Sequence, residues 1–159
     1  MCNAGVKSSG TAKLALEHMN NISDGLEKFA CGLVLYQYNY PEGKSIIDKY
    51  ISVNETPAPD YLDKLKFLDF NKAHVYLNQF SDTSNIEIKK KIIEMIEDNR
   101  GIELIKKFLK DPSYIVANLA IEKVIELGSR TVLELIKEIS SNPKLEKNAK
   151  LALAVFGEK

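Results

Sequence analysis

The sequence predicts an all-α protein of stacked antiparallel helix pairs, with about nine or ten helices along its 159 residues. Apolar residues recur at helical spacing through most of the chain. The last third of the chain also contains the same order of helix, Asx-Pro turn and helix twice. Hydrophobic residues make up 45% and charged residues 28%, which is typical of a globular protein and not of a disordered one.

The N-terminal part is predicted to be a disordered leader over residues 1–10, followed by a helical region over residues 11–54. The leader is small and polar, lacks the apolar core of a secretory signal, and has Cys2 where myristoylation needs glycine. Residues 26–34 carry apolar side chains at i, i+3, i+4, i+7 and i+8, which favours a helix. Residues 34–40 alternate in a way that also fits a strand, so residues 31–40 stay open between the two, with the helix preferred.

Residues 54–60 are the best candidate for a linker, because they contain Pro57 and Pro59. A short helix with leucines at helical spacing, Leu62, Leu65 and Leu68, is expected to follow. From residue 60 to residue 159 we expect helical repeats that are continuous with the preceding region.

Helix-start signals divide the C-terminal half. Ser84 to Glu87 has the form of a capping box, in which the Ser84 hydroxyl accepts from the Glu87 amide and a helix follows. A short amphipathic helix is predicted over residues 102–109. Asp111 and Pro112 are then expected at the N-cap and first position of a very apolar helix, about residues 113–127, which Gly128 ends. A last pair has Asn142-Pro143 between its helices and Gly157 at its end.

The two C-terminal pairs align as copies of one unit. Leu104, Ile105, Phe108 and Pro112 match Leu135, Ile136, Ile139 and Pro143, each 31 positions later. Ala117, Leu119 and Ala120 match Ala149, Leu151 and Ala152, each 32 positions later. A weaker third copy begins with Val75, Leu77 and Phe80. Because a single hairpin cannot cover its own apolar face, such copies are expected to stack.

This two-helix unit, with an Asp-Pro or Asn-Pro turn and an Ala-Leu-Ala run, resembles HEAT repeats and the related armadillo-type repeats over about residues 71–156. The units are shorter than the ~40 residues usual in that family. The resemblance implies a right-handed α-α superhelix that holds partners along its surface.

The residues offer no constellation for catalysis, so we expect neither an enzyme nor a cofactor. His18 and His74 have no partner at zinc-ligand spacing, and Cys31 lies in an apolar helix where a thiol behaves as a small hydrophobe. Glycine-rich nucleotide motifs are missing. With only Cys2 and Cys31, no structural disulfide is expected, and with no membrane span either, a cytoplasmic protein is the default expectation.

The charge balance argues against a polyanion as the partner. Lys plus Arg and Asp plus Glu both number 22, and neither sign dominates on either side of Asp60. The run Lys89-Lys90-Lys91 is interleaved with carboxylates, whereas phosphate binding favours a stripe of one sign. Nucleic acid is therefore kept only in the alternative hypothesis, a nucleic-acid-binding or DNA-repair enzyme on a HEAT-like scaffold.

The leading hypothesis is a non-catalytic protein-binding module, either an adaptor or an immunity- or inhibitor-type protein with one protein partner. A fragment of a longer solenoid is a third possibility. Two surfaces are candidates for the partner, because tyrosine is favoured at interfaces and second helices line the groove of a repeat stack. They are a tyrosine-rich turn and a polar helix edge: Tyr36, Tyr38 and Tyr40; Asn118, Glu122, Glu126, Lys147 and Lys150.

Overall fold

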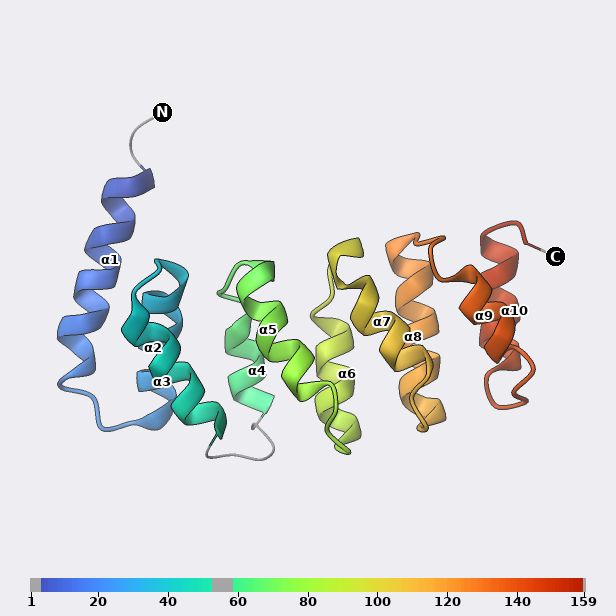
Figure 1. Ribbon diagram of the computed structural model, residues 1–159, viewed down its shortest axis with the longest axis horizontal. Coiled ribbons are helices and arrows are strands. Elements are labelled where there is room, and N and C mark those ends of the chain that lie inside the picture. Colours follow the sequence, from blue (N-terminus) through green and yellow to red (C-terminus); the bar gives the residue numbers. More distant parts are fainter. Residues whose placement is uncertain (1–3, 53–58, 159) are drawn as a thin grey trace. The chain divides into compact units, whose positions relative to one another are not determined.

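The computed structural model describes residues 4–52 and 59–158, and within these ranges the chain forms ten α-helices and no strand (Figure 1). The predicted all-α class is thereby confirmed. The helices are α1 (Ala4–Met19), α2 (Gly25–Gln37), α3 (Pro41–Ser52), α4 (Pro59–Leu65), α5 (Phe70–Phe80), α6 (Ile86–Glu94), α7 (Ile102–Leu109), α8 (Tyr114–Leu127), α9 (Leu133–Ile139) and α10 (Glu146–Val155). One 3₁₀ turn, Asn99–Gly101, precedes α7.

The chain divides into two compact units within α5, between Tyr76 and Leu77. Our sequence-based boundary lay earlier, in the proposed linker, of which residues 53–58 lie outside the described residues and Pro59 begins α4. The predicted leader also differs from the structure, because α1 already begins at Ala4; residues 1–3 lie outside the described part.

Unit 1 is organised around α2. One side of α2 packs on α1, where Ala12 and Ala15 meet Leu35. On another side, the buried ring of Phe29 makes an edge-to-face contact with Tyr61, at 4.8 Å between ring centroids. Leu62 and Leu65 of α4 are fully buried in this unit. The leucines of the predicted short helix thus anchor α4, as their spacing indicated.

The open question over residues 31–40 is resolved in favour of the helix, since α2 runs to Gln37. A Schellman motif ends it: Asn39 takes a left-handed φ of 64°, its N–H donates to the Tyr36 carbonyl, and the Tyr40 N–H donates to the Leu35 carbonyl. The ammonium group of Lys72 then donates to the carbonyls of Tyr36 and Gln37 at 2.8 and 2.7 Å. A cation at this end also complements the helix dipole.

Helices α2 and α3 approach so closely that glycine is required at their crossing. A Cβ added to Gly43 would lie 2.2 Å from the backbone nitrogen of Tyr36 and 2.7 Å from the carbonyl carbon of Leu35. Both atoms belong to a hydrogen-bonded helix backbone and cannot move aside. The close packing of α3 against α2 therefore depends on the absence of a Cβ atom at Gly43.

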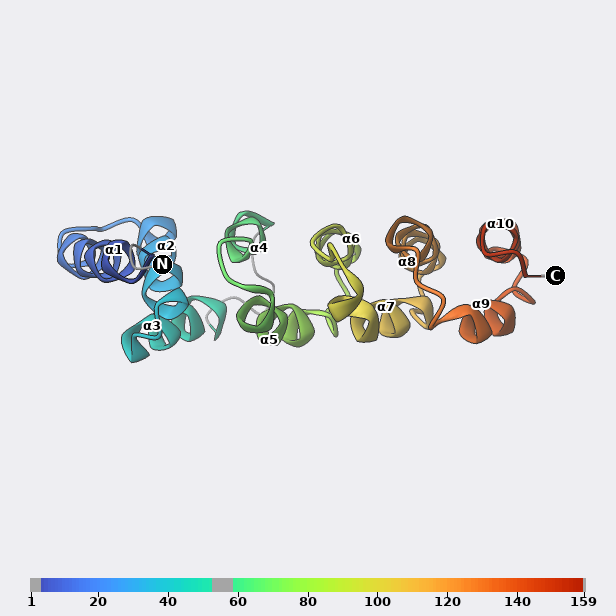
Figure 2. The same cartoon turned by 90° about the horizontal axis from the view of Figure 1, so that it is seen from above.

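Unit 2 has its helices in two layers. Figure 2 shows α6, α8 and α10 in one layer and α7 and α9 in the other, and α8 packs against α6, α7 and α10. The apolar side chains that the sequence placed on α7 and α8 are buried between these layers, among them Ile105, Phe108, Val116, Ala120 and Val124. Ala117 and Ala120 of α8 and Ala149 and Ala152 of α10 are all fully buried, which allows neighbouring helices to approach closely.

A turn of the same type precedes each of the helices α6, α8 and α10. A side-chain oxygen accepts from the backbone N–H two residues later in Thr83 to Asn85 (3.2 Å), Asp111 to Ser113 (2.9 Å) and Asn142 to Lys144 (3.0 Å). These turns are 28 and then 31 residues apart. Asx and Ser/Thr turns of this kind replace a backbone hydrogen bond with a side-chain one.

Two capping predictions were wrong in detail. Asn85, not Ser84, is the N-cap of α6, and its Oδ1 accepts from Glu87 and Ile88. Asp111 is not the N-cap of α8, because its carboxylate closes the turn and the helix begins three residues later, after Ser113. Gly128 and Gly157 do end α8 and α10, with φ values of 63° and 74°. Within the described residues, no helix combines the length and the apolar character that crossing a membrane requires.

We expect Gly43→Ala to lower the free energy of unfolding by at least about 2 kcal/mol, because the new methyl group must push α2 and α3 apart. The control is Gly10→Ala in α1, where an added Cβ has no heavy atom within 4 Å. That change should raise stability by about 0.5–1 kcal/mol through the helix preference of alanine. Urea unfolding followed by circular dichroism measures both, and equal effects of the two changes would contradict the close crossing.

Candidate partner-binding surfaces

A groove runs between α6 and α8 in unit 2. It has a volume of about 320 Å³ and is lined by Lys90, Ile93 and Glu94 from α6 and by Leu119, Glu122, Lys123 and Glu126 from α8. The four α8 residues follow the i, i+3, i+4, i+7 spacing that places side chains on one helix face. The apolar residues Val116, Ala120 and Val124 are turned to the core. The groove therefore follows directly from the amphipathic pattern of α8.

The groove combines a partly apolar surface with ion pairs of both signs. Lys123 is only 9% exposed, and its ammonium lies 2.8 Å from a Glu126 carboxylate oxygen. Lys90 pairs with Glu87 at 2.8 Å, and Glu94 pairs with Lys91 at 3.5 Å. Glu122 is exposed and has no ion-pair partner among the described residues. It is therefore the carboxylate of this groove that is available to a cation from outside.

The structure brings together only part of the predicted polar edge. Glu122 and Glu126 share the groove, but that groove is formed with α6. Asn118 contacts the turn before α10: its Nδ2 donates to the Lys144 carbonyl at 3.3 Å, and its Oδ1 is buried with no hydrogen-bond partner among the described residues. Lys147 and Lys150 lie exposed on α10, where Lys150 pairs with Glu146 and lowers the pKa of that carboxyl.

The three predicted tyrosines do not form one surface. Tyr36 is half-buried, with its ring edge-to-face with Tyr76 at 6.1 Å and the Lys72 ammonium 5.2 Å from its centroid. Tyr40 packs against the core formed by α1 and α2, and Tyr38 lies at an apolar cavity. Residues two apart on a helix are about 200° apart around its axis. The alternation that fitted a strand therefore sends Tyr36 and Tyr38 to different sides of α2.

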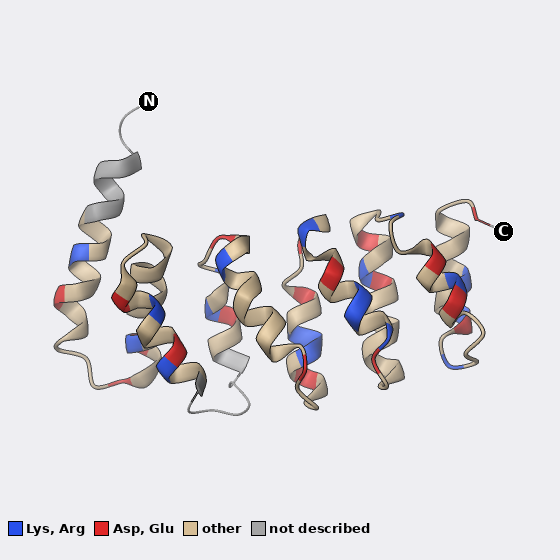
Figure 3. Ribbon diagram, in the orientation of Figure 1, with Lys and Arg blue, Asp and Glu red and all other residues tan. Residues whose placement is uncertain are grey.

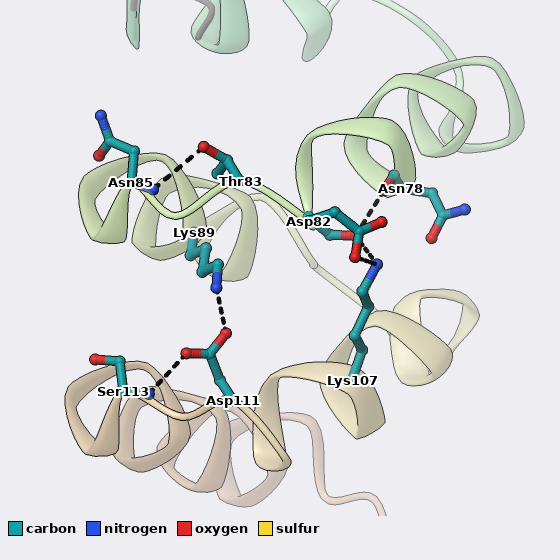
Figure 4. A network of polar contacts seen from close by, with 9 residues as sticks. Asn78, Asp82, Thr83, Asn85, Lys89, Lys107, Asp111 and Ser113 are labelled. Carbon is teal, nitrogen blue, oxygen red and sulfur yellow. Dashed lines mark hydrogen bonds and ion pairs between the residues drawn. The ribbon is translucent and has the colours of Figure 1, made fainter. Parts of the chain in front are cut away.

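The polar feature that the sequence analysis missed is a buried ion pair, shown in Figure 4. Lys89 is 9% exposed, and its ammonium lies 2.5 Å from Oδ2 of Asp111 in the turn before α8. The other oxygen of Asp111 accepts from Ser113, so one carboxylate both closes the turn and holds α6. The signal was present in the sequence, since Lys89 lies beside Ile88 and on the apolar stripe of Ile92 and Ile93, but the run of three lysines was considered only as a possible nucleic-acid contact.

A second lysine joins the preceding turn to α7. The ammonium of Lys107 lies 2.7 Å from the Asp82 carboxylate and donates to the Ser81 hydroxyl, also at 2.7 Å (Figure 4). Together with Lys89, it surrounds a surface pocket at these turns that Lys110 also lines. Two of the three lysines already have a carboxylate partner, so the pocket carries little free positive charge.

The thiol of Cys31 and the phenol of Tyr76 both lie in environments that raise the pKa and favour the protonated form. Burial, followed by the charge of Glu27, raises the pKa of the Cys31 thiol, which keeps it protonated and weakly nucleophilic. In the described part of the chain, no three His, Cys, Asp or Glu side chains gather as metal ligands. Tyr76 donates to Asp48 at 3.1 Å, and burial together with that carboxylate raises its pKa, so the phenol stays neutral.

We expect Lys89→Ala to lower the free energy of unfolding by about 3 kcal/mol, because it leaves the Asp111 carboxylate buried without its cation. The neighbouring change Lys90→Ala removes an exposed pair with Glu87 and should alter stability by less than about 0.5 kcal/mol. Denaturant unfolding of both variants tests this difference. If Lys89→Ala were as mild as its neighbour, the pair would not hold α6 to the turn.

Comparisons with known proteins leave the chain without an identified relative: no family model matches it, and neither does a curated protein or a solved structure.

Proposed function

We propose that this chain is a non-catalytic protein-binding module of HEAT-like helical repeats, an adaptor or an immunity- or inhibitor-type protein, and that the groove between α6 and α8 holds a segment of its protein partner. The observation that carries this proposal is the groove itself, with buried Ile93, part-buried Leu119 and a carboxylate, Glu122, that has no ion-pair partner in the described part of the chain. An apolar contact flanked by charges is the usual composition of a protein-binding surface.

The turns of unit 2 support the repeat interpretation. Three equivalent side-chain hydrogen bonds precede α6, α8 and α10, and the helices of each layer are neighbours. In a right-handed α-α superhelix, the second helices of successive pairs line one continuous surface. The α6–α8 groove would then be one step of a longer surface, and its partner an extended or helical segment that lies across it.

The charge distribution favours a protein over a nucleic acid as the partner. Figure 3 shows both signs interleaved along α6 to α10. Each lysine of the run 89–91 has a carboxylate partner: Asp111 for Lys89, Glu87 for Lys90 and Glu94 for Lys91. A phosphate backbone would have to break these pairs before it could gain its own. The complementary partner segment instead presents an apolar side chain to Ile93 and Leu119 and a Lys or Arg to Glu122.

We expect Glu122→Lys to weaken binding of the partner at least about tenfold, because it places a like charge opposite the partner's cation. Affinity capture from the native lysate, quantified by mass spectrometry, compares the unchanged chain with Glu122→Lys and with Glu138→Lys. Glu138 is the control because it is exposed on α9, in the other layer. Circular dichroism should show all three chains folded.

The supporting result is a protein that the unchanged chain and Glu138→Lys retain equally and that Glu122→Lys loses. If every captured protein were retained equally by all three chains, the groove would not be the binding site. Binding of duplex DNA whose affinity falls steeply with salt would overturn the proposal in favour of the nucleic-acid alternative.

A further inference from the structure

Unit 1 contains a cavity that the partner-binding proposal does not use. It has a volume of about 460 Å³ and lies between α1, α2 and the end of α4. Ala30, Leu33 and Val34 of α2 form its apolar wall. Tyr38, Lys64, Phe67 and the polar residues Thr11 and Gln37 also line it. This volume is within the range of small-molecule sites, about 300–1,000 Å³, and is too small for a helix of a partner protein.

Two exposed aromatic rings border the cavity. Phe67 is 69% exposed and Tyr38 is 39% exposed, although both rings lie next to an apolar wall that could accept them. An exposed phenylalanine ring forgoes the free energy that burial of its apolar surface would contribute. A bound apolar molecule would recover part of this by covering the ring of Phe67 and the wall of α2 together.

A cation without a carboxylate partner lies beside the apolar wall. The Lys64 ammonium is 5.8 Å from the centroid of the Phe67 ring, and the described residues provide no carboxylate within ion-pair distance of it. Lys66, only two residues later, does pair with Asp63, at 3.6 Å. The cavity thus combines an apolar interior with one available positive charge, so the complementary ligand has an apolar body and one negative charge.

We propose that this cavity binds a small amphiphilic monoanion, whose ring or alkyl body packs on Leu33, Val34 and Phe67 and whose carboxylate meets the ammonium of Lys64. The apolar body of this ligand is one or two rings or a medium-length alkyl chain. This inference is independent of the partner-binding groove, because every residue in it belongs to unit 1.

Two fluorescent probes that differ by one charge test the proposal on the full chain. 8-Anilinonaphthalene-1-sulfonate carries the anion, and N-phenyl-1-naphthylamine has the same aromatic body without it. The unchanged protein should bind the sulfonate probe more tightly. Lys64→Gln should weaken that probe at least about fivefold and leave the neutral probe within about twofold, because only the charged contact is lost.

The variants include a matched control. Lys66→Gln removes a nearby lysine of the same turn and should change neither affinity. Phe67→Ser should weaken both probes, and because Phe67 is exposed, the fold should persist, as circular dichroism can check. If Lys64→Gln and Lys66→Gln changed the sulfonate affinity equally, or if Phe67→Ser changed neither probe, the cavity would not be the site.

Competition experiments distinguish a small amphiphile from a protein side chain as the source of the anion. Decanoate should displace the sulfonate probe from the unchanged protein, and decanol should displace it much less. If N-acetyl-leucyl-glutamate amide competed better than decanoate, the small-amphiphile proposal would be overturned, and the cavity would be assigned to a side chain of a protein partner instead.

Discussion

The fold depends on each short helix being covered by its neighbours. Helix α7 has eight residues, well below the ~12–15 at which an isolated helix becomes marginally stable in water. Four of its apolar side chains, Leu104, Ile105, Phe108 and Leu109, are nevertheless at most 1% exposed. Packing against α8 supplies the stabilising free energy that the intrinsic helix propensity of so short a segment does not provide. Helix α7 is therefore stable only when packed against its neighbour, which is the condition under which repeated helix pairs stack.

Polar groups in the turns determine how these helices meet. Burial of apolar area is not directional, so it does not by itself select one arrangement of α6 against α8. The Asp111 carboxylate does have directional requirements, because one oxygen is held by the Ser113 amide and the other by the Lys89 ammonium. At the next step the connection is weaker: Asn118 reaches the Lys144 carbonyl with its amide nitrogen, and its oxygen remains unsatisfied. The successive steps of unit 2 thus share a turn geometry and differ in how tightly they are held.

The exposed surface reflects the same division between packing and binding. Several lysines on the solvent side of the helices pair with carboxylates three residues away, and such pairs contribute little to stability. Glu122 in the groove of unit 2 and Lys64 at the cavity of unit 1 differ from these lysines, because neither has an ion-pair partner among the described side chains. They have opposite charges, so the ligands proposed for them differ: a cationic protein segment for Glu122 and an amphiphilic anion for Lys64. Two exposed apolar residues on α10, Leu151 and Val155, are each 56% exposed and belong to neither site.

The sequence by itself determined the helices, because apolar periodicity and glycine stops act over a few residues: α2, α7 and α8 lie where their spacing predicted, and Gly128 and Gly157 end α8 and α10. The sequence also predicted that Glu122 and Glu126 lie on one face of their helix. It could not show that Lys89 is buried, that Asp111 closes a turn instead of capping a helix, or that Tyr36 and Tyr38 separate. Two of these outcomes are local: Asp111 accepts from Ser113, two residues later, and Tyr36 and Tyr38 separate because α2 continues to Gln37. The burial of Lys89 depends on which residue of another segment lies opposite. Only the tertiary structure decides that, since its partner Asp111 is 22 residues away in the chain.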